Sequence, residues 1–275
     1  MDVVDLKEFY ASPLGAAARR LIAHRIRARL RGMSGCIVLG VGYATPYLDV
    51  WRDEADRVIA FMPARQGVAH WPVNGVSATA LVDEAEMPLP DGCVDLALVV
   101  HGLELTEQLP ETLREIWRVL SPGGRAVFIV PNRSGMWART DRTPFGHGRP
   151  FSRTQLTDLL RDAMFSPSGW ANALFVPPIA RGFLVRSAAA WERLGLWLWP
   201  AFSGVIIVEA VKQVYAVRKP KRARRFVPKL KPVPVPAPAP VGSRRSGEIF
   251  HANRAGPASA IVIDRCLVGK GGETA

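Results

Sequence analysis

The chain has 275 residues, of which 48% are hydrophobic and 22% charged, and its formal net charge at pH 7 is +12. This apolar content is well above that of a disordered chain, and the length fits one domain of roughly 200 residues with additional sequence. The three cysteines, Cys36, Cys93 and Cys266, are widely spaced and match no metal-ligand pattern. They argue against a disulfide scaffold, and we expect no metal site.

The positive charge is concentrated at the C-terminal end. Residues 218–275 contain 13 Lys and Arg against 3 Asp and Glu, so residues 1–217 are nearly neutral. Residues 218–245 join a basic run to a proline-rich stretch, which predicts a disordered linker without a core. Residues 246–275 form a tail that contains a candidate docking strand. The basic residues 218–225 fit either non-specific contacts with nucleic-acid phosphates or a solvated tail that confers solubility.

The N-terminal sequence favours a cytoplasmic protein. It places acidic residues where a secretory signal requires positive charge. The longest uncharged apolar stretch, residues 194–208, is shorter than the ~20 residues of a membrane-spanning helix.

The first predicted element is a helix at residues 14–30, in which apolar residues recur every four positions. Arginines occupy much of its remaining surface: Arg19, Arg20, Arg25, Arg27, Arg29 and Arg31. This pattern fits a helix packed on the domain with a solvated basic face, or a helix lying on an anionic membrane or nucleic acid.

Short apolar runs then alternate with polar or helical segments. Strands are predicted at residues 36–39, 57–61, 78–82, 94–100, 126–130, 170–176 and 205–217. Helices are predicted at residues 111–120, ended by the SPGG stretch that follows, and at residues 153–164, capped by Ser152. Runs that are apolar on both faces predict a doubly wound, Rossmann-like α/β fold with a seven-stranded, mostly parallel sheet between helices, spanning residues 1–217. Ligands of such sheets bind at the carboxyl ends of the strands.

Three motifs follow these strands. The turn VLGVGYATPYL places Gly40, Gly42 and Ala44 at a spacing that lets the backbone approach a ligand, although a dinucleotide enzyme or a plain tight turn uses the same spacing. More specific are DEAEMPLPDGCVD at residues 83–95 and LPETLREIWRVLSPGGRAVFIVPN at residues 109–132. With these motifs in order, residues 36–217 resemble the class I, Rossmann-like S-adenosylmethionine-dependent methyltransferases, especially the small-molecule group.

The resemblance implies S-adenosylmethionine as the cofactor. The glycine turn would approach its methionine part, and Asp83 would accept a hydrogen bond from the adenine amino group. Arg118 and the Pro-Gly-Gly turn would hold the fold rather than touch ligand. The residues that the resemblance assigns to the cofactor are Gly40, Gly42, Tyr43, Ala44, Met62, Asp83, Glu84, Ala85 and His101.

Methyl transfer mainly requires alignment of the acceptor and exclusion of water, and a base is needed only if the acceptor loses a proton. His101, Glu104 and His147 are the candidates for this catalytic role, and each also fits a structural one. The candidate contacts for an anionic or polar acceptor are Asn132, Arg133, Arg149 and Tyr43.

Two positions depart from the family pattern. Val38 and Met62 stand where the family has acids, the second of which binds the ribose hydroxyls. Loss of a charged hydrogen bond costs ~1.5–3 kcal/mol. The leading hypothesis is a methyltransferase for a small or medium-sized acceptor, and the alternative is a non-catalytic binding or regulatory protein on the same scaffold. A nicotinamide dehydrogenase is less consistent with the sequence.

Overall fold

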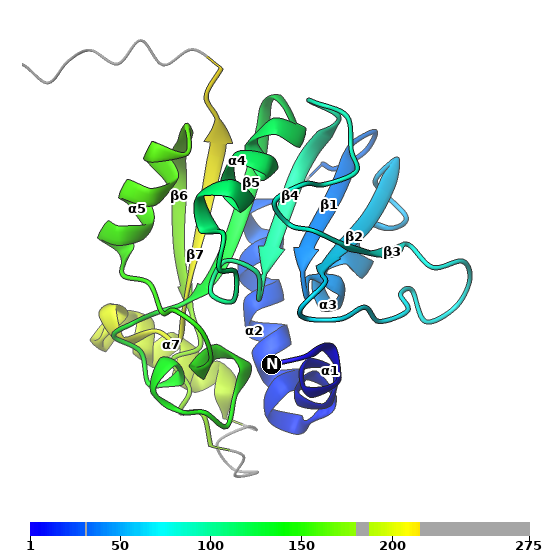
Figure 1. Ribbon diagram of the computed structural model, residues 1–275. Coiled ribbons are helices and arrows are strands. Elements are labelled where there is room, and N and C mark those ends of the chain that lie inside the picture. The colour runs from blue at the N-terminus through cyan, green and yellow to red at the C-terminus, as the bar shows by residue number, and fades with distance from the viewer. Residues whose placement is uncertain (31, 180–186, 215–275) are drawn as a thin grey trace, which may run out of the picture. The chain divides into compact units, whose positions relative to one another are not determined.

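A seven-stranded sheet forms the centre of the fold, with the strand order β3-β2-β1-β4-β5-β7-β6 (Figure 1). The computed structural model describes residues 1–30, 32–179 and 187–214. The strands are β1 (Ile37–Gly42), β2 (Arg57–Pro63), β3 (Thr79–Val82), β4 (Val94–Val100), β5 (Leu120–Pro131), β6 (Phe165–Ala173) and β7 (Val205–Lys212). All neighbouring strands pair in parallel except β7, which runs antiparallel to both β5 and β6. The predicted Rossmann-like, mostly parallel α/β fold is confirmed.

Helices cover both faces of the sheet. They are α1 (Val3–Ala11), α2 (Pro13–Arg29), α3 (Thr45–Leu48), α4 (Leu109–Val119), α5 (Arg153–Asp162) and α7 (Ala188–Leu198). Successive strand residues point to opposite faces, so Val38 joins the core beneath α2 and α3, whereas Leu39 joins the core beneath α4 and α5. Within the described ranges, no helix is long and apolar enough to cross a bilayer.

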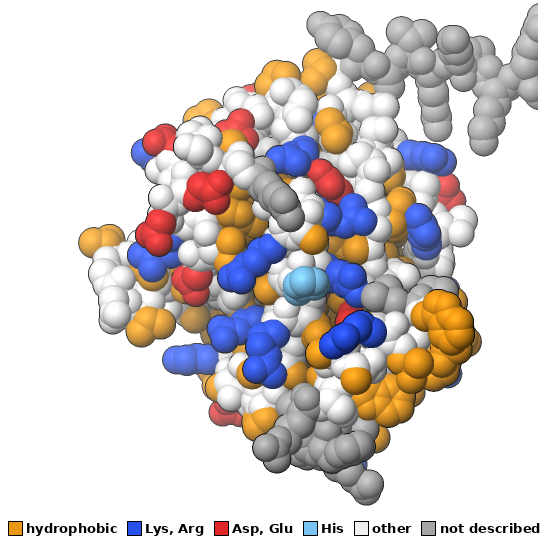
Figure 2. All heavy atoms as spheres, turned by 180° about the vertical axis from the view of Figure 1, so that it is seen from behind, with side chains coloured by type: hydrophobic (Ala, Val, Ile, Leu, Met, Phe, Trp, Pro, Cys, Tyr) orange, Lys and Arg blue, Asp and Glu red, His pale blue; other side chains and the backbone are white. Residues whose placement is uncertain are grey.

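The predicted basic helix is α2, and it packs on the domain. Its apolar stripe is buried, with Ile22 fully enclosed and Ile26 2% exposed, while Arg20 and Arg27 are exposed on the other side. Figure 2, which views the molecule from behind, shows Lys and Arg side chains gathered over one face around a histidine. The helix therefore contributes to the core and to a basic surface at once.

The helix α1 was not predicted. Asp2 caps it by accepting hydrogen bonds from the backbone N–H groups of Val4 and Asp5, and the Asp5 carboxylate accepts from the Asp2 N–H in return. Ser12 ends α1 and caps α2 by accepting from Gly15 N–H. Two short helices thus meet at one residue, which turns α1 toward the ends of the strands.

Several predicted boundaries were wrong. β1 does not stop before the glycine turn but runs through Gly42, because this stretch pairs with β4 up to Val100. The SPGG stretch does end α4, but it lies inside β5, where the register shifts between Val94 and Leu96. The sixth strand is Phe165–Ala173, and the aromatic segment after it forms α7. Ser152 caps α5 as predicted, by accepting from Gln155 N–H. The linker and tail predicted at residues 218–275 lie outside the described residues.

Candidate functional site

A cavity of about 140 Å³ opens where β2, β3 and β4 reach their carboxyl ends. Figure 1 shows α1 lying at this edge of the sheet, below the arrowheads of β1 and β4. The residues that line the cavity are Met1, Pro63, Arg65, Gln66, Glu84, His101, Gly102, Leu105 and Thr106. A cavity therefore lies at the carboxyl ends of the strands, where the site was predicted.

The glycine turn passes directly against the end of β4. Gly42 has φ +77°, and an added Cβ would lie 2.3 Å from the carbonyl oxygen of Val100 and 3.0 Å from that of His101. Tyr43 N–H donates to the same Val100 carbonyl at 2.8 Å. Only glycine combines this backbone conformation with this approach, and the turn brings Gly42 beside His101.

His101 is the centre of a buried hydrogen-bond network. It is 1% exposed and has φ +50°, a conformation that costs about 1–3 kcal/mol for a non-glycine residue and is typical of functional sites. Its Nδ1 lies 3.1 Å from Oε1 of Glu104, and its Nε2 lies 2.9 Å from the hydroxyl oxygen of Tyr10. The carboxylate of Glu104 therefore orients the imidazole, as in a base that is positioned by an acid.

The helix α1 covers this network. The Tyr10 ring stacks on Tyr43 with centroids 5.7 Å apart, and its hydroxyl lies 3.1 Å from that of Tyr47. Burial raises the pKa of the Tyr10 and Tyr47 hydroxyls well above their usual value. Both side chains are consequently neutral hydrogen-bonding groups across the physiological range.

The loop at residues 143–152 lies against the same network. The Phe145 ring lies 4.7 Å from the His101 ring, and Arg149 N–H donates to the Glu104 carbonyl at 2.9 Å. His147 is not brought into the network, since its Nε2 lies 2.9 Å from the Asp141 carbonyl oxygen. Of the three predicted catalytic residues, the structure brings together His101 and Glu104.

The predicted cofactor residues fall into two groups. Gly42, Tyr43, Glu84 and His101 lie on the cavity or on the network beside it. Ala44 and Met62 are fully buried, and the sulfur of Met62 accepts from Ala69 N–H at 3.3 Å. Ala44 and Leu48 pack closely over Gly40. Asp83 is exposed and binds Ala85 N–H within its own turn. The roles assigned to these residues stay predictions.

The polar residue that the sequence did not reveal is Gln66. It follows β2 by three residues, is 4% exposed and lines the cavity. Its Nε2 donates to the His101 carbonyl at 3.0 Å, whereas its Oε1 is buried with no hydrogen-bond partner. A single glutamine in a loop carries no signal in the sequence. Gln66 reaches His101 only because β2 and β4 lie on either side of β1 in the folded sheet.

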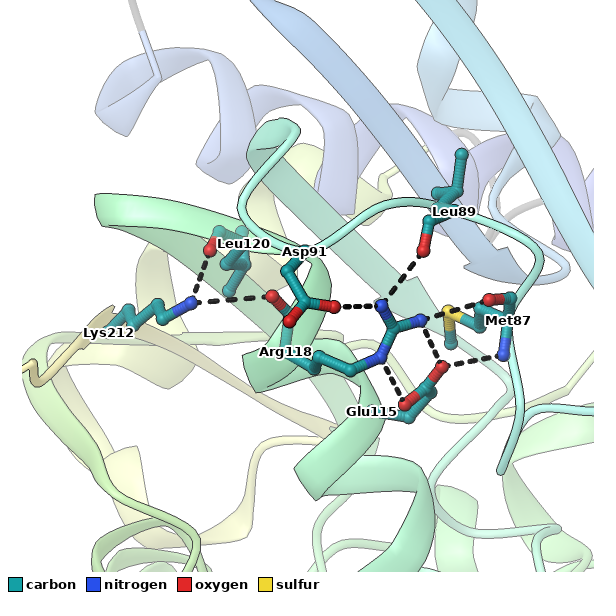
Figure 3. Close-up of polar contacts among 7 residues, drawn as sticks. All are labelled: Met87, Leu89, Asp91, Glu115, Arg118, Leu120 and Lys212. Atoms are coloured by element: carbon teal, nitrogen blue, oxygen red, sulfur yellow. Dashed lines mark hydrogen bonds and ion pairs between the residues drawn. The ribbon is translucent and has the colours of Figure 1, made fainter.

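The Arg118 side chain holds the two specific motifs together (Figure 3). It donates to the backbone carbonyls of Met87 and Leu89 and pairs with the carboxylates of Asp91 and Glu115. The hydrogen bonds from Arg118 hold the pKa of Glu115 below its usual value. The predicted structural role of Arg118 is confirmed, and this contact fixes the loop that leads from β3 to β4.

Other features of the described chain do not compete with this site. A cavity of about 480 Å³ lies between α4 and α5, and none of the predicted site residues lines it. Within the described residues, no three His, Cys, Asp or Glu side chains gather as a metal site requires. The side chain of Asn132 has a structural role, because its Nδ2 donates hydrogen bonds to the carbonyls of Ala201 and Ser203.

Comparison with known proteins agrees with this geometry. Residues 33–128 match the family model described as a methyltransferase domain. A probable S-adenosylmethionine-dependent methyltransferase of Mycolicibacterium smegmatis is 33% identical over 150 residues, which are 52% of this chain and 54% of that protein. The malonyl-(acyl-carrier protein) O-methyltransferase of Pectobacterium atrosepticum is 27% identical over 136 residues, which are 46% of this chain and 54% of that protein. The chain thus spans about half the length of these curated relatives.

A solved structure supports the fold. A protein of Thermotoga maritima, described as a S-adenosylmethionine-dependent methyltransferase and possible histamine N-methyltransferase, superposes with a TM-score of 0.55 at 16% identity. The similarity covers 77% of this chain and 96% of that one, so it extends well beyond the matched residues 33–128.

Proposed function

We propose that this chain, whose residues 33–128 match a methyltransferase-domain family and whose fold is Rossmann-like, transfers a methyl group from S-adenosylmethionine to a small or medium-sized acceptor. One observation carries the proposal. The glycine turn, Glu84 and the His101–Glu104 pair come from separate segments and converge at the carboxyl edge of the sheet. This is the place where α/β sheets of this type bind their ligands.

The polar groups of the cavity suit the nucleoside part of such a cofactor. It offers an unpartnered, buried amide oxygen on Gln66 and a carboxylate on Glu84, both of which accept hydrogen bonds from hydroxyl or amino groups. At about 140 Å³ it is smaller than the roughly 300–1,000 Å³ of typical small-molecule pockets. Since Met1 lines the cavity and Tyr10 covers His101, a shift of α1 is the movement that enlarges it.

The residues of this chain have distinct tasks in the proposal. Bound S-adenosylmethionine supplies a methyl group on a sulfonium that is already activated for nucleophilic attack. At Gly42, which lies close to the end of β4, the turn presents backbone atoms and no side chain. His101, oriented by Glu104, accepts a proton where the acceptor must lose one, and Phe145 excludes water beside it.

Support for a small acceptor comes from the relatives and from the walls of the site. The names of the curated relatives include an O-methyltransferase that acts on a carrier-protein-bound malonyl group. In this chain, Leu105 provides apolar surface in the cavity, and the buried Phe145 packs against His101 of the His101–Glu104 pair. An acceptor that joins an apolar part to one ionisable or hydroxyl group fits this combination.

Calorimetric titration tests the proposal. We expect S-adenosylhomocysteine and S-adenosylmethionine to bind the full chain with dissociation constants in the micromolar range. Absence of binding at millimolar ligand would end the proposal. Acceptors are then screened by the release of S-adenosylhomocysteine, with Glu104→Gln as the comparison variant, because it keeps the side-chain shape but not the orienting charge.

A second candidate function is favoured by one specific observation. Tyr10, Tyr43 and the fully buried Met62 pack in the core beside the cavity, and Met62 supplies no carboxylate for a sugar. A non-catalytic binding or regulatory protein on a methyltransferase scaffold would have apolar and aromatic side chains packed at this position. A structure with bound S-adenosylhomocysteine and a displaced α1 would count against this candidate, whereas α1 in place over an unchanged cavity would favour it.

A further inference from the structure

We propose that Gln66 accepts a hydrogen bond from a ribose hydroxyl of the cofactor, and so replaces the carboxylate that the chain lacks at Met62. This inference rests on the proposed function and names a binding residue for the same site. It assigns to a neutral amide, in the loop after β2, the task that an acid performs at the end of that strand in the family.

The position of Gln66 supports this role. It lies on the wall of the cavity together with Pro63, the last residue of β2, and with His101 and Gly102 at the end of β4. The side chain is 4% exposed, so its conformation is fixed by its surroundings. Val3 N–H also donates to the Gln66 carbonyl at 2.7 Å, which ties the loop to the start of α1.

The orientation of the amide follows from its one hydrogen bond. The His101 carbonyl can only accept, so the group 3.0 Å from it must be the NH₂ of Gln66. The amide oxygen is then the atom that is buried without a partner. Buried polar atoms are nearly always hydrogen-bonded in native proteins, and an orphan beside a cavity indicates a ligand donor that is missing.

The other charged and hydroxyl side chains of the cavity differ from Gln66, because each already has a hydrogen-bond or ion-pair partner and Glu84 is only partly buried. Glu84 accepts a hydrogen bond from the Thr106 hydroxyl at 3.1 Å, and Thr106 in turn contacts Thr112. Arg65 pairs with Glu107 and is largely exposed, and a guanidinium has no acceptor for a hydroxyl proton. Gln66 is thus the buried group of the cavity wall that has an unused acceptor.

The test compares ligands that differ by one hydroxyl. S-adenosylhomocysteine and its 2′-deoxy and 3′-deoxy analogues are titrated into the full chain by calorimetry. For the wild type, we expect removal of the contacted hydroxyl to weaken binding about fivefold, the effect of one neutral hydrogen bond. Gln66→Met keeps the length of the side chain without its amide. In this variant, we expect the ratio of the two dissociation constants, deoxy analogue over S-adenosylhomocysteine, to fall to nearly one.

Because the substitution changes the affinity for S-adenosylhomocysteine and for its deoxy analogue alike if it only perturbs the fold, the ratio of the two affinities cancels such a general effect. Gln213→Met, at an exposed position after β7, is the matched control and should keep the wild-type ratio. If Gln66→Met fails to fold, equal affinity of the wild type for all three ligands would still overturn the inference, and persistence of the hydroxyl effect in Glu84→Gln would support it. A hydroxyl effect that disappears in Glu84→Gln but persists in Gln66→Met would overturn it as well. Failure of S-adenosylhomocysteine to bind the wild type would instead refute the proposed function itself.

Discussion

Tyr10 and His101 are 91 positions apart in the sequence, yet the hydroxyl oxygen of Tyr10 lies 2.9 Å from Nε2 of His101. Both side chains are almost fully buried. The contact fastens the N-terminal helix α1 to the end of β4, beside the candidate cofactor cavity. The contact therefore holds α1 against this edge of the sheet.

The first prediction concerns this fastening. Tyr10→Phe removes the hydroxyl that bonds to both His101 and Tyr47, at about 1 kcal/mol for each hydrogen bond, and we expect it to raise the population of chains with α1 displaced. If the ligand enters through the displaced form, the association rate of S-adenosylhomocysteine should increase about fivefold or more. Stopped-flow tryptophan fluorescence measures this rate.

Val4→Ala is the control for this experiment, since Val4 lies on the same helix and is 57% exposed. It should leave the rate unchanged. An association rate that is equal in Tyr10→Phe and the wild type would show that α1 does not limit access to the cavity.

The second prediction separates two effects of replacing a glycine that has a positive φ: the strain of the backbone conformation and the steric contact of the added Cβ. Gly42 and Gly123 have φ of +77° and +78°, but an added Cβ meets Val100 O at 2.3 Å only in Gly42 and meets nothing within 4 Å in Gly123. We expect Gly123→Ala to lower the free energy of unfolding by about 1 kcal/mol, from conformation alone. Gly42→Ala should lower it by about 3 kcal/mol or more, because the strand end must also move.

Urea denaturation at constant pH measures both variants. Similar midpoints for Gly42→Ala and Gly123→Ala would contradict the close approach between the glycine turn and β4. Gly42→Ala should also weaken binding of S-adenosylhomocysteine, whereas Gly123→Ala should not, since Gly123 lies at the opposite ends of the strands.

The third prediction is a pH dependence of stability. Hydrogen bonds from Arg118 lower the pKa of Glu115 in the folded chain, so its ionised form stabilises the fold at pH values above the unfolded pKa of about 4.3. This contribution is lost as the pH falls through the lowered, folded pKa. Glu115→Gln should thus be about 2 kcal/mol less stable than the wild type at pH 7, and this difference should shrink in acid.

Urea denaturation of both proteins at a series of pH values between neutral and acid tests this expectation. The exposed Glu86 provides a control, because the free energy of unfolding of Glu86→Gln should change with pH as that of the wild type does. A difference between wild type and Glu115→Gln that stays constant down to the lowest pH would show that charge plays no part in this contact.

The fourth prediction concerns the basic tail. Residues 218–275 carry 13 of the 36 Lys and Arg of the chain. If residues 218–225 bind phosphates, deletion of residues 218–275 should abolish retention of double-stranded DNA in a filter-binding assay. Retention of the full chain should fall steeply as salt rises from about 50 to 200 mM.

The arginines of α2 provide the comparison for this deletion. Arg20 and Arg27 lie exposed on the described domain. Retention that survives the deletion but is lost in the Arg20→Gln, Arg27→Gln double variant would transfer the binding surface from the tail to α2.

The sequence by itself determined the class of fold and the strands of its parallel core. Short runs that are apolar on both faces, such as residues 96–100, require burial on both faces, and this requirement alone predicts a covered parallel sheet. The two motifs around Glu84 and Arg118 also indicated the resemblance to methyltransferases, and the folded chain joins them through the hydrogen bonds from Arg118 to the Met87 and Leu89 carbonyls.

Only the tertiary structure decided the composition of the site. Gln66 and His101 meet because β2 and β4 flank β1, and Tyr10 meets His101 because α1 turns back across the strand ends. Such contacts depend on strand order and on side-chain packing between distant segments, and no local periodicity encodes them. The missing acid at Met62 was visible in the sequence, whereas the buried amide oxygen of Gln66 emerged only when the chain was folded.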